Sequence, residues 1–451
     1  MLRVVGTWGL AVSVINIVVG AGIFVLPAAL AASIGPYAPL AFLGCGLAVG
    51  AVALCLAEGG SRVPTSGGIY GYVNEAFGPL AAYVSGTLLW AGDVLACGGI
   101  AAALGAVCAS IMPQSLAPAT RVLSIVGVTG AIALINIGGV VRGTRLIEVA
   151  TVLKLLPLLV FVLAGTGALL FAHHAGALAH AAVAHAAVTH AAVASAAAPA
   201  AALAHRNLGR GLILGVFAFS GMETSLAASG EVRHPARTIP RALAAAMLSV
   251  TVLYIAIQLV AQGLLGGALA TSSVPLSDAM ARIHPALRAL MLAGAAVSMF
   301  GWMGTDILGT PRLLFAFARD GLMPRVLGRV HPRTHAPHVA ILCYAALVLA
   351  LALSGSFAEL AVLSSLASAA LYIAGCAAAW RLRRRRIAHA GPPLNFPALG
   401  AIALVAIGAM LAMIALASRL EIIGLAILVA ASAAVYAVVT RLSRSRIIAA
   451  Q

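Results

Sequence analysis

Charged residues are scarce in this chain of 451 residues, and Lys154 is its only lysine. Asp, Glu, Lys and Arg together make up 8% of the residues, whereas 63% are hydrophobic. Soluble domains contain about 25% charged and about 45–50% apolar residues. The shortage of charge therefore excludes a water-soluble fold. Apolar stretches recur along nearly the whole sequence, and about 20 apolar residues suffice to cross a hydrocarbon layer about 30 Å thick.

We predict an all-α integral membrane protein with twelve transmembrane helices, in the cell membrane, with both termini in the cytoplasm. The predicted spans are residues 8–32, 37–58, 80–111, 121–140, 146–171, 208–230, 241–267, 286–318, 337–354, 357–380, 396–417 and 420–440. The interruptions between these spans are too short to hold a soluble domain.

Acidic residues are also few, and the formal net charge is +16. In a soluble protein this excess would suggest nucleic acid as a partner. Here most arginines fall in or beside the predicted cytoplasmic segments, as the positive-inside rule requires. The basic runs at 381–386 and 441–446 therefore predict membrane topology and contacts with lipid headgroups, not nucleic-acid binding. A cleaved signal peptide in the first 32 residues would place most arginines outside, so we reject it. The arginines predicted on the extracytoplasmic side are Arg121, Arg206, Arg210, Arg282, Arg288 and Arg419.

No Cys-x-x-Cys pair occurs among the six cysteines, which lie in apolar spans. This excludes a disulfide framework and a zinc site of the usual spacing. A His/Ala-rich segment, residues 173–207, repeats His-Ala-Ala-Val from positions 180, 185 and 190. Five residues turn a helix by about 500°, which spreads the histidines over different faces. We predict an extracytoplasmic loop there, with neither a metal site nor a cofactor.

Two apolar spans are interrupted by glycine and polar residues. The first contains Gly20-Ala21-Gly22 followed by Pro27, and the sixth contains Ser220-Gly221 followed by Glu223. Five crossings separate the two interruptions, so the two spans run in opposite directions. Paired, glycine-interrupted spans of this kind are typical of the central site of transporters. The alternative is that these glycines are close-packing contacts between helices.

At these residues the sequence resembles the amino acid-polyamine-organocation family of transporters. Five segments carry the resemblance, in the same order along residues 1 to about 340. They are Val19–Pro27, Pro64–Tyr70 with Glu75–Gly78, Phe217–Glu223, Glu231–Arg241 and Ala318–Pro324. The last four spans resemble the family only in hydropathy.

The resemblance implies a five-plus-five inverted repeat that works by alternating access, with discontinuous first and sixth helices. The two repeats would cover residues 1–172 and 208–380, separated by the loop 173–207. Residues 381–451 would add two C-terminal helices and a basic tail.

The resemblance also implies a substrate site at the two interruptions. The carboxylate of an amino acid would bind the unwound first helix at Gly20, Ala21, Gly22 and Ile23. The ammonium group would bind unwound carbonyl groups of Phe217, Ser220 and Gly221 in the sixth. An aromatic ring, Phe217 or Phe219, would close over the ligand. The alternative for either phenylalanine is ordinary packing.

Three ionisable residues inside the spans are singled out as candidates, since each costs about 2.5–3.5 kcal/mol on insertion scales. Asp93 could bind a cationic side chain; alternatively it pairs internally with Lys154 or is protonated because it is desolvated. Lys154 resembles the lysine of proton-coupled family members, and a buried lysine releases its proton more readily than one in water. Alternatively, its long side chain reaches towards water. Glu223 is either a second protonation site or a hydrogen-bond partner of the loosened backbone.

These features predict a secondary active transporter of amino acids, with cationic amino acids or polyamines as candidate substrates. Its partners would be a small-molecule substrate, a proton and membrane lipids. An amino acid/amine exchanger of the same fold is the alternative. An enzyme would need a cluster of nucleophile, base or metal ligands at one depth, and a channel would need a polar stripe on several helices. The sequence shows neither pattern.

Overall fold

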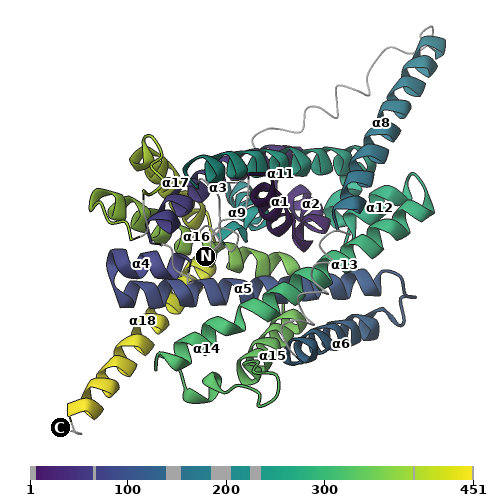
Figure 1. Ribbon diagram of the computed structural model, residues 1–451. Helices are drawn as coiled ribbons and strands as arrows, with labels where there is room; N and C mark the ends of the chain where they lie inside the picture. Colours follow the sequence, from purple (N-terminus) through teal and green to yellow (C-terminus); the bar gives the residue numbers. More distant parts are fainter. Residues whose placement is uncertain are drawn as a thin grey trace.

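The computed structural model describes residues 7–63, 68–138, 154–183, 205–223, 235–389 and 392–448. These residues form helices and loops, and no strand occurs among them (Figure 1). The helices before the His/Ala-rich segment are α1 (Thr7–Val18), η1 (Ala21–Phe24), α2 (Leu26–Ile34), η2 (Gly35–Tyr37), α3 (Ala38–Arg62), α4 (Ile69–Phe77), α5 (Pro79–Ala109), α6 (Ala117–Ile137) and α8 (Leu155–Val183).

The helices after that segment repeat the pattern of long apolar helices and short connections. They are α9 (His205–Phe219), α11 (Pro235–Leu265), η5 (Gly266–Thr271), α12 (Pro275–Ala281), α13 (Pro285–Gly309), α14 (Pro311–Arg319), η6 (Arg325–Gly328), α15 (His338–Ser354), α16 (Phe357–Arg384), α17 (Leu399–Ala415) and α18 (Arg419–Ile448).

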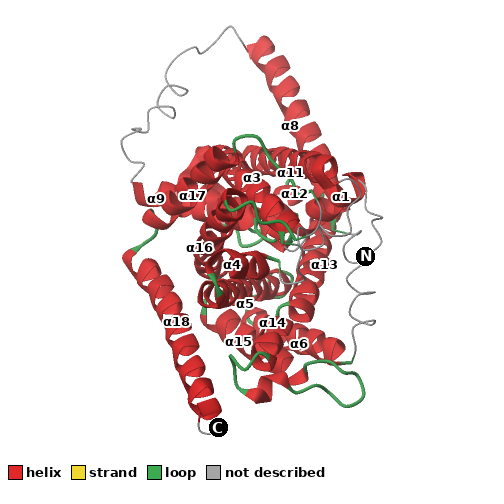
Figure 2. Cartoon of the chain, turned by 60° about the vertical axis from the view of Figure 1, so that its left-hand side comes forward, coloured by secondary structure: helices red, strands yellow, loops and turns green. Residues whose placement is uncertain are grey.

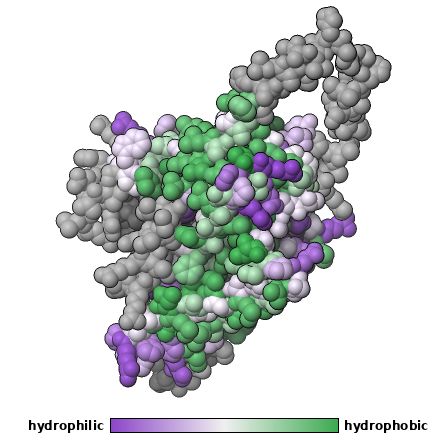
Figure 3. Space-filling view, turned by 90° about the vertical axis from the view of Figure 1, so that its right-hand side faces the viewer, coloured by the Kyte–Doolittle hydropathy of each residue, from purple (hydrophilic) through white to green (hydrophobic). Residues whose placement is uncertain are grey.

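Seven helical stretches of the described residues are long and apolar enough to cross a membrane. Shorter apolar helices accompany them, including α1, α9, α15 and α17. Large hydrophobic side chains such as Leu163 and Leu47 are 73% and 70% exposed, an arrangement that water would not tolerate over so much surface. Figure 3 shows hydrophobic residues over much of one face. The chain is therefore a multi-pass membrane protein.

The centre of the molecule is formed by α5 and α16, which pack against each other. In their most apolar stretches 78% and 72% of the residues are buried, compared with 6% in α18. Accordingly, α18 runs along the outside of the bundle, with α5 and α16 inside (Figures 1 and 2). Helices α1 and α3 pack against α11, and α9 packs against α3 and α16. The two glycine interruptions follow α1 and α9.

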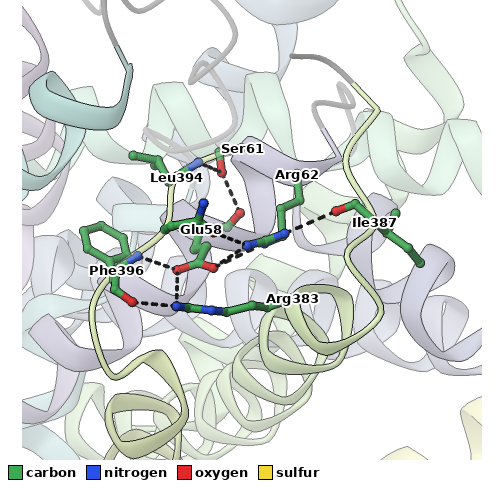
Figure 4. A network of polar contacts seen from close by, with 8 residues as sticks. Glu58, Ser61, Arg62, Arg383, Ile387, Leu394 and Phe396 are labelled. Carbon is green, nitrogen blue, oxygen red and sulfur yellow. Dashed lines mark hydrogen bonds and ion pairs between the residues drawn. The ribbon is translucent and has the colours of Figure 1, made fainter. Parts of the chain in front are cut away.

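A buried polar network ties α3 to α16 and to the segment before α17 (Figure 4). Glu58 is 0% exposed, and its Oε1 lies 2.8 Å from a guanidinium nitrogen of Arg62. Its Oε2 accepts hydrogen bonds from the backbone N–H of Phe396 at 2.9 Å and from Arg383 at 3.3 Å. Because every carboxylate oxygen has a donor, the buried charge is compensated.

Several predicted boundaries agree with the structure to a few residues. The fourth predicted span, 121–140, corresponds to α6, and the tenth, 357–380, to α16. Helix α8 continues past the predicted end at 171 to Val183, so the start of the segment 173–207 is helical. Residues 184–204 lie outside the described residues. So do residues 64–67 and 231–234 of the quoted segments.

Candidate functional site

The first predicted interruption is a break in the helix. Helix α1 ends at Val18, Gly20 is extended with φ −90° and ψ −166°, and the chain then forms η1 and α2. Glycine weakens a helix by about 1 kcal/mol relative to alanine. Gly20 is the residue before η1, and it has no side chain that could cap the first N–H groups of η1. The predicted carboxylate-binding residues Gly20, Ala21, Gly22 and Ile23 therefore lie at a helix N-terminus, which favours negative charge.

The second interruption is also a break. Helix α9 ends at Phe219, and Gly221 adopts φ +101°, a conformation that glycine tolerates best. Ser220 donates its backbone N–H to the carbonyl oxygen of Phe217 at 3.3 Å. The ordinary helical hydrogen bonds stop here, so the C-terminal end of α9 carries partial negative charge.

The two breaks meet in space. A Cβ atom on Gly22 would lie 3.0 Å from the ring of Phe217, and one on Gly221 would lie 3.2 Å from a side-chain carbon of Ile17. The hydroxyl oxygen of Tyr254, from α11, lies 2.8 Å from the carbonyl oxygen of Val18 and 3.1 Å from that of Ala218. One tyrosine thus contacts the last turns of both broken helices.

The two candidate aromatic residues point in different directions. Phe217 lies against Gly22 and packs edge-on against Phe357 of α16, with ring centroids 5.6 Å apart. Phe219 packs between Phe42 and Tyr254, at 6.5 and 5.4 Å, and is fully buried. Of the two rings, Phe217 is the one beside the first break, and Phe219 is part of the core.

Trp302 of α13 is a second aromatic residue at the first break, and the sequence did not single it out. A Cβ atom on Gly20 would lie 3.2 Å from the indole ring. The ring is partly exposed. The break is therefore flanked by Phe217 on one side and Trp302 on another, and both lie against glycines.

Lys154 is buried, with 7% of its surface exposed. Its ammonium nitrogen donates a hydrogen bond to the backbone carbonyl of Asn16 in the last turns of α1. Its amine thus bonds to α1, and no ion pair between Lys154 and Asp93 occurs among the described residues. The only lysine therefore contacts α1 close to the first break.

Glu223 contacts the loosened backbone of the second break. Its Oε2 accepts a hydrogen bond from the N–H of Gly221 at 3.1 Å and from the hydroxyl of Tyr372, on α16, at 2.9 Å. The side chain is 9% exposed. Glu223 thus holds the turn at Gly221 and connects it to the central helix α16.

Asp93 lies beside a second carboxylate that the sequence analysis missed. The hydroxyl oxygen of Thr310 is 3.0 Å from Asp93 Oδ2 and 3.0 Å from Asp306 Oδ1. Tyr344 of α15 donates its hydroxyl hydrogen to the other oxygen of Asp306. Asp306 follows Trp302 by one helical turn on the same face of α13. An aspartate inside the apolar span 286–318 was the signal available in the sequence.

No group of three or more His, Cys, Asp or Glu residues suited to a metal ion occurs in the described part of the chain. The two breaks offer helix ends of opposite partial charge with Phe217 and Trp302 beside them, and the carboxylates of Glu223, Asp93 and Asp306 lie inside the helix bundle. Such groups can bind a small polar or charged molecule without forming a covalent bond.

Comparisons with known proteins agree with this arrangement. Residues 5–439 match the family model described as amino acid permease. The methylthioribose transporter of Bacillus subtilis is 27% identical over 357 residues, which cover 75% of this chain and 72% of the relative. The serine/threonine exchanger SteT of the same organism is 26% identical over 384 residues, covering 82% and 81%.

A longer match is an uncharacterized transporter of Mycobacterium tuberculosis, which is 30% identical over 446 residues. The alignment covers 94% of this chain and 89% of that relative. Since the family model spans nearly the whole chain and the relatives are named as transporters, the chain belongs to the amino acid permease family of membrane transporters.

Proposed function

We propose that the protein carries an amino acid across the cell membrane by alternating access, with the substrate held between the two broken helices. The observation that supports this most directly is the meeting of the two breaks, where Gly22 contacts Phe217 and Gly221 contacts Ile17. Main-chain groups freed by a break cannot face lipid, so they must line protein or a wet cavity. In this proposal they line the substrate site.

The arrangement of the breaks suits a zwitterion. The N–H groups at the start of η1, from Ala21 to Ile23, offer partial positive charge to a carboxylate. The carbonyl groups at the end of α9, including that of Phe217, and those of Ser220 and Gly221 offer partial negative charge to an ammonium group. Phe217 is the ring we assign to the ligand, because Phe219 is enclosed by Phe42 and Tyr254.

We assign the substrate to cationic amino acids or polyamines. Asp93 and Asp306 share the hydroxyl of Thr310, and neither forms an ion pair with a basic residue among the described residues. A cationic side chain would compensate these carboxylates at low cost, because buried charges require partners. Asp306 lies one turn of α13 after Trp302, and Trp302 lies against Gly20.

We propose that a proton drives uptake and that Lys154 takes part in the coupling. The protonated amine holds the carbonyl of Asn16, and loss of the proton would weaken this contact with α1. One charge moved across about 100 mV yields about 2.3 kcal/mol, enough for accumulation of about fifty-fold. Glu223, which holds the second break, is the candidate for a second protonation site.

The proposed topology has twelve spans arranged as a five-plus-five inverted repeat with two additional helices. In this scheme α1 to α8 form the first repeat, α9 to α16 the second, and α17 and α18 the additional pair. The two termini lie in the cytoplasm, because the basic runs before α17 and at the end of α18 then face inside.

Exchange is the second candidate function, because one relative is named as a serine/threonine exchanger. An exchanger would use the same breaks but would move substrate only against a second substrate inside. Purified protein in liposomes distinguishes the two. Uptake of radiolabelled amino acid into empty vesicles, faster under an inward pH gradient, supports symport. Uptake only into amino-acid-loaded vesicles supports exchange, and no uptake in either case contradicts the transport proposal for the tested substrates.

A further inference from the structure

A cavity of about 450 Å³ lies away from the two breaks, in the connection between α11 and α13. Leu265, Ala268 and Ala281 form the apolar part of its wall. The polar part is contributed by Thr271, Ser272, Asp278, Arg282 and Arg288. In the proposed topology this end of the helices faces the extracytoplasmic side, near the lipid headgroups.

Two arginines at this cavity are exceptions to the charge distribution of the chain. Arg282 and Arg288 belong to the small group predicted on the extracytoplasmic side, and both line the same cavity. Such residues work against the positive-inside rule. Arg288 also lies in the first turn of α13, where the helix dipole already adds partial positive charge. The positive charges at the cavity therefore repel one another, and a bound anion would compensate them.

The guanidinium groups are not neutralised by the neighbouring carboxylate. Asp278 Oδ2 accepts a hydrogen bond from the hydroxyl of Ser272 at 2.6 Å. Among the described residues, no ion pair joins Asp278 to Arg282 or Arg288. Among the described residues, the Nε atom of Arg288 is buried without a hydrogen-bond partner. Buried donors in native proteins nearly always have an acceptor, so the guanidinium group of Arg288, which lines the cavity, is short of acceptors.

We propose that the cavity binds an oxyanion of the phosphate class, held by Arg282 and Arg288. The guanidinium group presents parallel N–H donors that match two phosphate oxygens. The cavity is larger than a bare phosphate requires, and its apolar wall of Leu265, Ala268 and Ala281 suits the first methylene groups of phospholipid acyl chains. Free phosphate and an anionic lipid headgroup offer the same chemistry, and the experiment separates them.

Binding is measured on the purified, delipidated full chain in detergent, without any transport assay. Native mass spectrometry compares phosphatidylglycerol with phosphatidylcholine of the same acyl chains. Thermal unfolding is followed with sodium phosphate and with sodium chloride at equal ionic strength. The variants are Arg282→Gln, the double variant Arg282→Gln with Arg288→Gln, and Asp278→Asn. Arg419→Gln is the matched control, an exposed arginine predicted on the same side.

We expect an oxyanion to bind the native chain and the Arg419→Gln variant alike, and to bind the double variant about tenfold more weakly, as for the loss of charge-assisted hydrogen bonds. Asp278→Asn should bind equally or more tightly, because a repelling charge is removed. Selective retention of phosphatidylglycerol identifies a lipid headgroup, and stabilisation by phosphate alone identifies the free ion.

Two results would overturn the proposal. One is equal binding of both lipids together with no phosphate effect on the native chain. The other is loss of binding in Asp278→Asn, which would indicate a cationic or zwitterionic ligand. Arg282 is exposed, so the single variant Arg282→Gln preserves the test if the double variant fails to fold. In that case the proposal requires the single variant to bind the oxyanion more weakly than the native chain.

Discussion

Tyr254 donates the hydrogen of its hydroxyl group towards the carbonyl oxygen of Val18, which lies 2.8 Å away at the last residue of α1. The same oxygen is 3.1 Å from the carbonyl of Ala218 in α9. A hydroxyl group has one hydrogen, so it is shared between the two carbonyls or alternates between them. Helix α11 thereby connects the ends of two helices whose own hydrogen bonds have stopped.

Tyr254→Phe should lower uptake by about tenfold while the protein still folds, because one buried hydrogen bond contributes about 1 kcal/mol or more. Initial rates in proteoliposomes measure the effect, with size-exclusion chromatography as the check on folding. Tyr72→Phe is the matched control: its hydroxyl is buried, and no hydrogen bond to it is found among the described residues. Equal losses in the two variants would show that Tyr254 has no special role.

Gly22→Ala should impair transport, because the added Cβ atom would lie 3.0 Å from the ring of Phe217. That distance forces a shift of the ring or of the break. Gly50→Ala, where the new carbon meets nothing within 4 Å, should transport normally. Combining Gly22→Ala with Phe217→Leu should recover part of the packing but not the substrate affinity if Phe217 contacts the ligand. Full recovery of affinity would remove Phe217 from the site.

Lys154→Ala should abolish the dependence of uptake on an inward pH gradient while leaving substrate binding measurable. The variant lacks the only lysine, whose amine holds the carbonyl of Asn16. Binding is followed by thermal shift with substrate, since a ligand stabilises the native state. Gradient-driven uptake at the native rate in this variant would exclude Lys154 from coupling.

Asp93→Asn and Asp306→Asn should each weaken cationic substrates by about tenfold or more and neutral ones much less, because a charge-assisted contact contributes about 1.5–3 kcal/mol. Competition of lysine, ornithine and serine for uptake measures the difference. Thr310→Val keeps both carboxylates and removes the shared hydroxyl, so it tests geometry without changing charge. A uniform loss for all substrates in the aspartate variants would indicate a structural role.

Glu58→Gln should destabilise the folded protein by about 3–5 kcal/mol, because it leaves the buried Arg62 without its counter-charge. Thermal unfolding in detergent measures the change. Glu75→Gln is the matched control: its pair with His389, at 3.5 Å, is exposed and contributes about 0–1 kcal/mol. Similar melting temperatures for the two variants would contradict this account of Glu58.

The sequence alone determined that the protein folds in lipid and where its first and sixth spans are interrupted. A chain with 63% hydrophobic and 8% charged residues can fold only in lipid, so its helical character followed from composition. The interruptions at Gly20 and Gly221 were predictable because glycine and proline act locally, through the backbone conformations that they allow. The predicted spans matched helices such as α6 and α16 for the same reason.

Only the tertiary structure decided which side chains meet. Phe217 and Phe219 are two residues apart and chemically equal, and the packing of α3 and α11 around Phe219 leaves Phe217 beside Gly22. Asp306 and Asp93, more than two hundred residues apart, both lie within hydrogen-bond distance of the Thr310 hydroxyl, and no local pattern encodes this arrangement. Composition acts on every residue separately, whereas a site depends on helix rotation and register, which are set by packing among many helices at once.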